Sequence, residues 1–229
     1  MIFAFDPPWN AESLSLLDAR RGERVLQVTA HSVPPVHALL DRVGGDGLLV
    51  VVDPNDAVVD RLLTIEHPAL SVIALEPTGE EILGRFDAMY ASPAWNIGWP
   101  IERWGTIISH SLRPGGRFVL DLPAESACEV VASAWRAAGE AAGLGRWRGP
   151  SEGDAAQGLR KLGLRNVQGE VGTHLARFES PRELAEFATA ELETDADFVE
   201  SLRIKLAERL QTDGEIEVVF RRTCVHGIR

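Results

Sequence analysis

The feature that most constrains the fold is an alternation of short aliphatic runs with segments of helical periodicity. Residues 48–52 form an unbroken aliphatic run, which is typical of a parallel strand covered on both faces. Ahead of it, residues 25–28 form another short run, and residues 34–43 carry apolar side chains at helical spacing. Strands separated by helices of this length predict an α/β fold with a doubly wound, Rossmann-like parallel sheet.

The same alternation continues to the end of the chain. Further strands are predicted at residues 70–75, 86–91, 117–122, 166–178 and 215–223. Further helices are predicted at residues 103–111, 125–141, 155–162, 181–192 and 198–210. No repeat or linker interrupts these segments. We therefore expect one domain over residues 1–229, with a helical insertion at about 179–212 before the last strand.

Composition narrows the classes of partner. The chain has a net charge of -11 and a pI near 5.0, so it offers no general basic surface for nucleic acid. Cys128 and Cys224 lie far apart without metal-binding spacing, which indicates neither a zinc site nor a disulfide framework and favours a reducing cytoplasm. No segment has the length and apolarity of a membrane span. We expect a cytoplasmic protein without a metal that binds a small molecule or a protein, with a homodimer as an open alternative.

Four stretches, taken in order, carry a family resemblance. They are Gly22 to Leu26, Val50 to Pro54, Gly84 to Ala88, and Leu112 to Leu120 with its Leu-Arg-Pro-Gly-Gly turn. In this order and spacing they resemble the class I S-adenosylmethionine-dependent methyltransferases of the small-molecule type, over nearly the whole chain. The resemblance implies a seven-stranded sheet whose last strand is antiparallel. It also implies S-adenosylmethionine as the cofactor.

The chain departs from that family in the loop after the first strand. The family has an acid followed by three alternating glycines there, whereas this sequence has Gln27 and then Thr29, His31 and Val33 at the glycine positions. The resemblance assigns Thr29 and His31 to the cofactor site. Because a β-branched residue is strained at positive φ, we expect residues 29–33 to take another path with ordinary negative φ. We then expect weak or absent binding of S-adenosylmethionine.

Two acids follow the next strands. Asp53 ends the second predicted strand, and the resemblance implies that it accepts hydrogen bonds from both ribose hydroxyls. The alternative is a turn or capping residue before Pro54. Glu76 follows the third predicted strand, where the family holds the adenine amino group with an acid. The alternative for Glu76 is an ordinary solvated loop carboxylate.

Substrate contacts are expected after the fourth strand. Ser92-Pro93-Ala94-Trp95 resembles the loop with which amino-methylating members of the family hold the acceptor nitrogen, except that Ala replaces the second proline. Ser92 and Trp95 are therefore candidate substrate-binding residues. The alternative is a tryptophan that packs against the sheet edge beside Trp99 and Trp104. Asp6-Pro7-Pro8-Trp9 has the same type of sequence but lies ahead of the nucleotide loop, so we interpret it as an entry turn to a helix.

Two functions of different classes follow. The first is methyl transfer from S-adenosylmethionine to a small molecule, a reaction that depends on positioning rather than on acid or base groups, so no catalytic residue is assigned. The second is a non-catalytic relative that has lost cofactor binding and serves as a binding or dimerising module.

Overall fold

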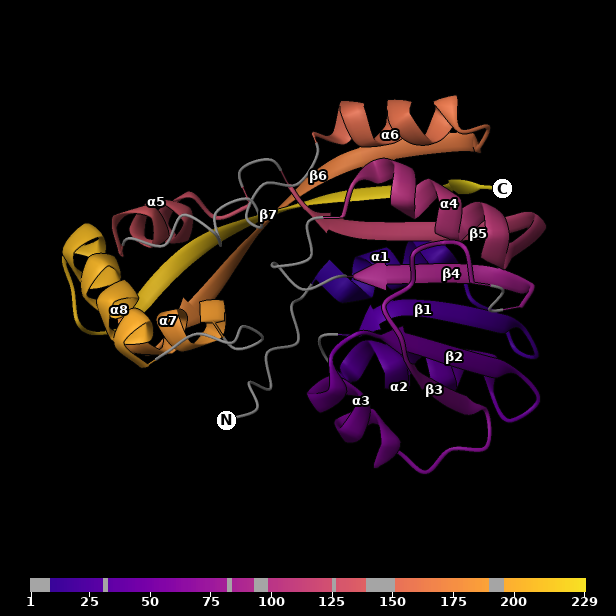
Figure 1. The fold of residues 1–229 in the computed structure, drawn as a ribbon, viewed down its shortest axis with the longest axis horizontal. Helices are drawn as coiled ribbons and strands as arrows, with labels where there is room; N and C mark the ends of the chain where they lie inside the picture. Colours follow the sequence, from indigo (N-terminus) through magenta and orange to yellow (C-terminus); the bar gives the residue numbers. More distant parts are fainter. Residues whose placement is uncertain are drawn as a thin grey trace.

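The computed structural model describes residues 9–30, 33–81, 84–92, 99–124, 127–138, 151–189 and 196–229. Its centre is a seven-stranded sheet with the strand order β3-β2-β1-β4-β5-β7-β6 (Figure 1). The pairs among β1 to β5 are parallel, and β7 is antiparallel to both β5 and β6. The predicted fold class, including the antiparallel last strand, is confirmed.

Each predicted strand is present, with modest differences at the ends. The strands are β1 Arg24–Ala30, β2 Leu48–Asp53, β3 Leu70–Ala74, β4 Phe86–Ser92, β5 Leu112–Pro123, β6 Arg165–Phe178 and β7 Ile216–Ile228. Strand β5 begins at Leu112 rather than Arg117, because Leu112 pairs with Phe86 before the register shifts. Gly115 lies within that shift at a φ of 81°, a conformation that glycine adopts without steric cost.

Two layers of helices cover the sheet. Helices α1 Trp9–Leu17, α2 Pro34–Val43 and α3 Asp56–Leu63 share one buried cluster with residues of β1 and β2. Helices α4 Ile101–Ser111 and α6 Glu152–Lys161 form the cluster on the opposite face. The strand residues alternate between the two clusters, Leu26 and Val28 on one face and Val25 on the other. This arrangement leaves the carboxyl ends of β1 to β5 uncovered by the two helix layers, and ligands bind at these ends in such sheets.

A second core lies beyond the end of β5. Strand β7 pairs with β5 no further than Arg222, opposite Pro123, yet its pairing with β6 continues to Ile216 opposite Phe178. The overhanging two-stranded ribbon carries α5 Glu129–Ala138, α7 Pro181–Thr189 and α8 Ala196–Leu210, which Figure 1 shows beside the main sheet. We call this ribbon and its three helices the lobe.

The lobe is held by its own apolar side chains. Trp135 of α5 is fully buried and meets Phe198 of α8 edge-on, with ring centroids 4.9 Å apart. Phe178 and Phe220 of the ribbon belong to the same cluster. Helices α7 and α8 occupy the span between β6 and β7 in which the insertion was predicted. The sequence did not indicate that α5 joins them.

Candidate functional site

The candidate site residues that the structure describes lie at the carboxyl ends of the parallel strands. Thr29, Asp53 and Ser92 lie at the carboxyl ends of β1, β2 and β4, and Glu76 follows β3. Because the strand order there is β3-β2-β1-β4, the four positions follow one another along the carboxyl-terminal edge of the sheet. Two further candidates, His31 and Trp95, lie outside the described residues.

Thr29 corrects the expected path of the loop. Its φ is 59°, in the left-handed region, whereas residues 29–33 were expected to have negative φ. The β1–β4 register shifts between Val28 and Ala30, and the left-handed residue lies within this irregularity. Thr29 is 1% exposed, and its Oγ1 donates to the carbonyl of Val28 at 2.6 Å. This conformation costs an L-residue about 1–2 kcal/mol, so the chain keeps a glycine-like turn without the glycine.

The rest of the loop is described in part. Val33, at the third glycine position of the family, has a φ of -75° and precedes α2 in a helical conformation. At this residue the expected negative φ is confirmed. Pro34 and Pro35 open α2, as their missing N–H groups and fixed φ allow at a helix start.

The turn at Thr29 brings the next backbone amide to Asp53. The N–H of Ala30 donates to Asp53 Oδ2 at 2.7 Å, and the N–H of Asn55 donates to Asp53 Oδ1 at 2.8 Å. Asn55 in turn caps α3 by accepting from the N–H of Ala57 at 2.9 Å. Asp53 is 3% exposed, and burial raises the pKa of its carboxyl, against the lowering effect of the two backbone hydrogen bonds.

The Asp53 carboxylate nevertheless retains capacity to accept further hydrogen bonds. Each carboxylate oxygen has two lone-pair sites, and the two backbone donors use one on each. No Lys or Arg of the described residues forms an ion pair with Asp53. Asp53 therefore acts as a turn residue through its two backbone hydrogen bonds, and each of its oxygens can still accept one further hydrogen bond.

Gln27 is a second polar group within β1. It lies where the resembled family has its acid, and it is 1% exposed. Its Oε1 has no hydrogen-bond partner among the described residues. A buried amide oxygen without a donor is unfavourable by about 1–3 kcal/mol, so this position is not optimised for stability alone.

Glu76 lies at the same edge but in a different environment. Its side chain is 61% exposed and forms an ion pair of 3.1 Å with Arg103 of α4. The guanidinium of Arg103 also lies 3.8 Å from the ring centroid of Trp99, and its Nε donates to the carbonyl of Pro77 at 2.8 Å. Glu76 is therefore tied to α4 rather than projecting alone into solvent.

Ser92 belongs to a buried polar cluster that sequence reasoning missed. Arg222 of β7 donates from Nη2 to Ser92 Oγ at 3.3 Å and from Nε to Asp121 Oδ1 at 3.0 Å. Ser13 of α1 donates to the other oxygen of Asp121 at 2.8 Å. The side chains of Arg222 and Asp121 are 2% and 1% exposed. The cluster joins α1, β4, β5 and β7 at the base of the lobe.

The buried cluster affects neighbouring ionisable groups. Burial raises the pKa of Tyr90 strongly and raises the pKa of Cys224 to about 12, and the charge of Asp121 acts in the same direction on both. The only sequence signals for the cluster are the charged residues Asp121 and Arg222 inside apolar strands. Their pairing depends on the β5–β7 register, which the sequence did not predict.

Two observations concern other kinds of site. Among the described residues, no group of three or more His, Cys, Asp or Glu side chains is arranged to hold a metal ion. None of the helices in the described ranges has the length and apolar character required to cross a membrane.

No protein-family model matches the sequence, and no curated protein matches it. Solved structures share the fold at low sequence identity. The YcgJ protein from Bacillus subtilis has a TM-score of 0.63 and 14% identity, covering 96% of this chain and 97% of that chain. The phosphoethanolamine N-methyltransferase 2 of Haemonchus contortus, solved with phosphomonomethylethanolamine and S-adenosylhomocysteine, has a TM-score of 0.62 and 14% identity, covering 99% and 54%.

An S-adenosylmethionine-dependent methyltransferase from Thiobacillus denitrificans, solved with S-adenosyl-L-homocysteine, has a TM-score of 0.54 and 18% identity, covering 97% of this chain and 93% of that chain. At these identities the likeness concerns the fold alone. The chain has the fold of class I S-adenosylmethionine-dependent methyltransferases.

Proposed function

We propose that this chain binds S-adenosylmethionine at the carboxyl ends of β1 and β2 and transfers its methyl group to a small molecule. The observation that carries the proposal is the left-handed conformation of Thr29, with a φ of 59°. A strained backbone conformation persists where the surrounding structure or the function requires it. A loop released from cofactor binding has no reason to keep a turn that glycine makes at lower cost.

The residues around this turn are compatible with the cofactor. Asp53 accepts from two backbone N–H groups and has one further lone-pair site on each oxygen, which suits the two hydroxyls of a ribose. Gln27 adds a buried amide oxygen without a partner among the described residues. Thr29 and Asp53 would hold the nucleoside part, with Glu76 further along the same edge. The cofactor supplies an activated methyl group on its sulfonium.

The protein's own contribution to such a reaction is positioning. Methyl transfer by in-line displacement needs the acceptor atom held against the methyl group more than it needs an acid or a base. Ser92 ends β4 next to β1, and Arg222 fixes its hydroxyl through a hydrogen bond of 3.3 Å. Ser92 would thereby define one wall of the acceptor site, and Trp95 stays a predicted substrate-binding residue. The substrate would be a small molecule enclosed between this edge and the lobe.

The second candidate function, a non-catalytic relative, is favoured by residues that differ from those of the methyltransferase family. Gln27 replaces the acid of the resembled family, and His31 and Val33 replace two of its glycines. Both oxygens of Asp53 already accept hydrogen bonds from the chain itself. These features favour a non-catalytic relative that binds a partner or dimerises without using the cofactor.

Isothermal titration calorimetry with S-adenosylmethionine and S-adenosylhomocysteine distinguishes the two functions. The methyltransferase proposal predicts saturable binding of both compounds and loss of binding in Asp53→Ala. Transfer of radiolabel from methyl-labelled S-adenosylmethionine to a panel of small amines, phenols and carboxylates then tests the reaction. Absence of any binding by a folded wild-type chain would support the non-catalytic relative instead.

A further inference from the structure

In the lobe, one edge of strand β7 extends past the end of β5 and has few partners among the described residues. Arg221 still uses this edge, since its N–H donates to the carbonyl of Ala127 at 2.7 Å and its carbonyl accepts from the N–H of Ala124 at 3.1 Å. Hydrogen-bonding directions alternate along an antiparallel strand. The N–H and carbonyl groups of Glu217 and Val219 therefore point to the same edge, away from β6.

Within the described part of the chain, nothing pairs with that edge beyond Arg221. No backbone or side-chain group of the described residues bonds to the main chain of Glu217 or Val219 on this side. The interruption has a simple cause, because β5 ends at Pro123 and the chain enters α5 at Glu129. An unpaired strand edge is a template for a further strand.

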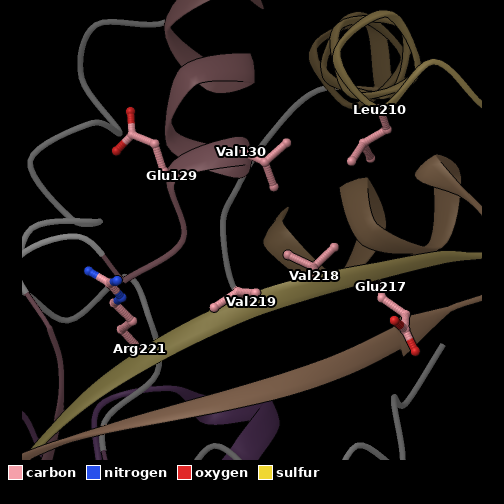
Figure 2. Close-up of a pocket in the computed structure, with 7 residues that line it drawn as sticks. All are labelled: Glu129, Val130, Leu210, Glu217, Val218, Val219 and Arg221. Carbon is pink, nitrogen blue, oxygen red and sulfur yellow. The ribbon is translucent and has the colours of Figure 1, made fainter.

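A pocket of about 490 Å³ lies beside this edge (Figure 2). Its apolar lining comes from Val130 of α5, Leu210 of α8, and Val218 and Val219 of β7. Val219 is 48% exposed. The pocket therefore offers an apolar recess next to backbone groups that no described residue pairs with, the combination with which a sheet edge binds an extended segment.

Charged side chains complete the lining and indicate the kind of segment. The pocket has two carboxylates, Glu129 and Glu217, and one guanidinium, Arg221. Glu129 pairs with Arg136, and Glu217 pairs with Arg177. Both ion pairs are exposed, so they contribute little to stability and the carboxylates can exchange partners. The chain as a whole has a net charge of -11, which favours association with a cationic partner.

We propose that this edge binds an extended peptide segment of a partner protein, which adds as a strand to β7 along the line that β5 leaves. The segment places an apolar side chain in the pocket and a Lys or Arg beside Glu129 or Glu217. Its backbone pairs with the N–H and carbonyl groups of Glu217 and Val219. This peptide site is separate from the candidate cofactor site around Asp53, and its existence does not depend on the proposed methyl transfer.

The test uses the full-length, isotope-labelled protein and the peptide acetyl-Lys-Val-Thr-Val-Lys-amide. We expect saturable shifts of the backbone amides of Glu217 and Val219, together with about tenfold slower hydrogen exchange at these amides, because strand addition protects them. The matched control is the same peptide N-methylated at alternate residues, which keeps its side chains but removes the donors along one edge. We expect this control not to bind.

Two variants at one position separate backbone pairing from side-chain contact. Val219→Pro removes an outward N–H, a substitution that an edge strand tolerates, whereas Val219→Thr keeps the N–H and a β-branched side chain. We expect the proline variant to weaken peptide binding at least about tenfold and the threonine variant to bind nearly as the wild type does. If the proline variant fails to fold, the N-methylated peptide still provides the comparison.

Several outcomes would overturn the proposal. Equal binding of the methylated and unmethylated peptides would indicate a pocket for apolar side chains without strand addition. Unchanged hydrogen exchange at the amides of Glu217 and Val219 in the presence of saturating peptide would likewise exclude strand addition. Sedimentation showing a wild-type dimer that Val219→Pro dissociates would assign the edge to a second copy of this chain. Failure of the peptide to bind at all would leave the edge without the proposed partner.

Discussion

Asp53 and Asp121 are both buried at the carboxyl side of the sheet, with exposures of 3% and 1%, but they meet different partners. Asp121 is neutralised by Arg222 at 3.0 Å and accepts from Ser13 at 2.8 Å. Asp53 is held by the backbone N–H groups of Ala30 and Asn55. A carboxylate that forms an ion pair is a structural element, whereas Asp53, held by backbone N–H groups and influenced by the charge of Arg61 without an ion pair between them, can still receive the hydroxyls of a ligand.

The comparison predicts its largest effect at the Asp121–Arg222 pair. Arg222→Ala leaves Asp121 charged and buried, so we expect the free energy of unfolding to fall by about 3–5 kcal/mol. The matched control is Arg177→Ala, which breaks the exposed Arg177–Glu217 pair of 2.8 Å in the lobe. We expect that change to cost less than about 1 kcal/mol. Urea denaturation of the two variants measures both, and equal losses would contradict a structural role specific to the buried pair.

A smaller effect is expected in ligand binding at Asp53. Asp53→Ala should weaken the binding of S-adenosylhomocysteine by about 1–3 kcal/mol, because charge-assisted hydrogen bonds to the ligand are lost. Glu76→Ala is the comparison, since Glu76 is 61% exposed and paired with Arg103. We expect Glu76→Ala to have the smaller effect in calorimetric titration. A wild-type affinity retained in Asp53→Ala would remove Asp53 from the site.

Thr29 allows the strain in the loop to be measured directly. Thr29→Gly relieves about 1–2 kcal/mol of left-handed strain, costs about 0.5–1 kcal/mol of chain entropy and, like Thr29→Ala, loses the hydrogen bond to Val28, so we expect it to be more stable than Thr29→Ala by about 0.5–1 kcal/mol. Thr29→Ala keeps the strain and loses the hydrogen bond to Val28, so it should not stabilise. Thermal and urea unfolding of both variants measure the difference. Equal stability of the glycine and alanine variants would mean that Thr29 is not strained.

The raised pKa of Asp53 predicts a pH dependence. The carboxyl of Asp53 binds its proton more tightly in the folded state than in the unfolded state, where its pKa is near 3.8. Protonation of Asp53 therefore contributes fully to the free energy of unfolding below that pH, and this contribution is lost as the pH rises through the folded-state pKa. Asp53→Asn removes this titration. We therefore expect the wild type to lose stability relative to Asp53→Asn as the pH rises from the unfolded value, measured by urea midpoints over that range. A difference that does not vary with pH would contradict the raised pKa.

Much of the fold was predictable because each strand or helix carries a local pattern. The aliphatic run of β2 and the spacing in α2 appear in the structure at the predicted positions. The lobe was predicted only in part, because the long-range pairing of β6 with β7 beyond Arg222 decides where α5 packs. No local pattern encodes that pairing.

The candidate site was predictable to a smaller degree. The position of Asp53 at the end of β2 followed from the run before it. The conformation of Thr29 was predicted wrongly, because local steric preference favours negative φ for a β-branched residue and tertiary structure overrides it here. The Asp121–Arg222 pair joins residues far apart in the chain, so its formation depends on the strand register.

A crystal structure of the wild-type chain grown with S-adenosylhomocysteine would show whether the nucleoside binds at Asp53 and Thr29. We expect the nucleoside to lie at the carboxyl ends of β1 and β2, with its ribose hydroxyls hydrogen-bonded to Asp53 and with Thr29 still at positive φ. We also expect the Asp121–Arg222 pair to keep its present distance of 3.0 Å. A nucleoside bound elsewhere, or a loop that binds it only after Thr29 moves to negative φ, would contradict a cofactor site built on Asp53 and the left-handed Thr29.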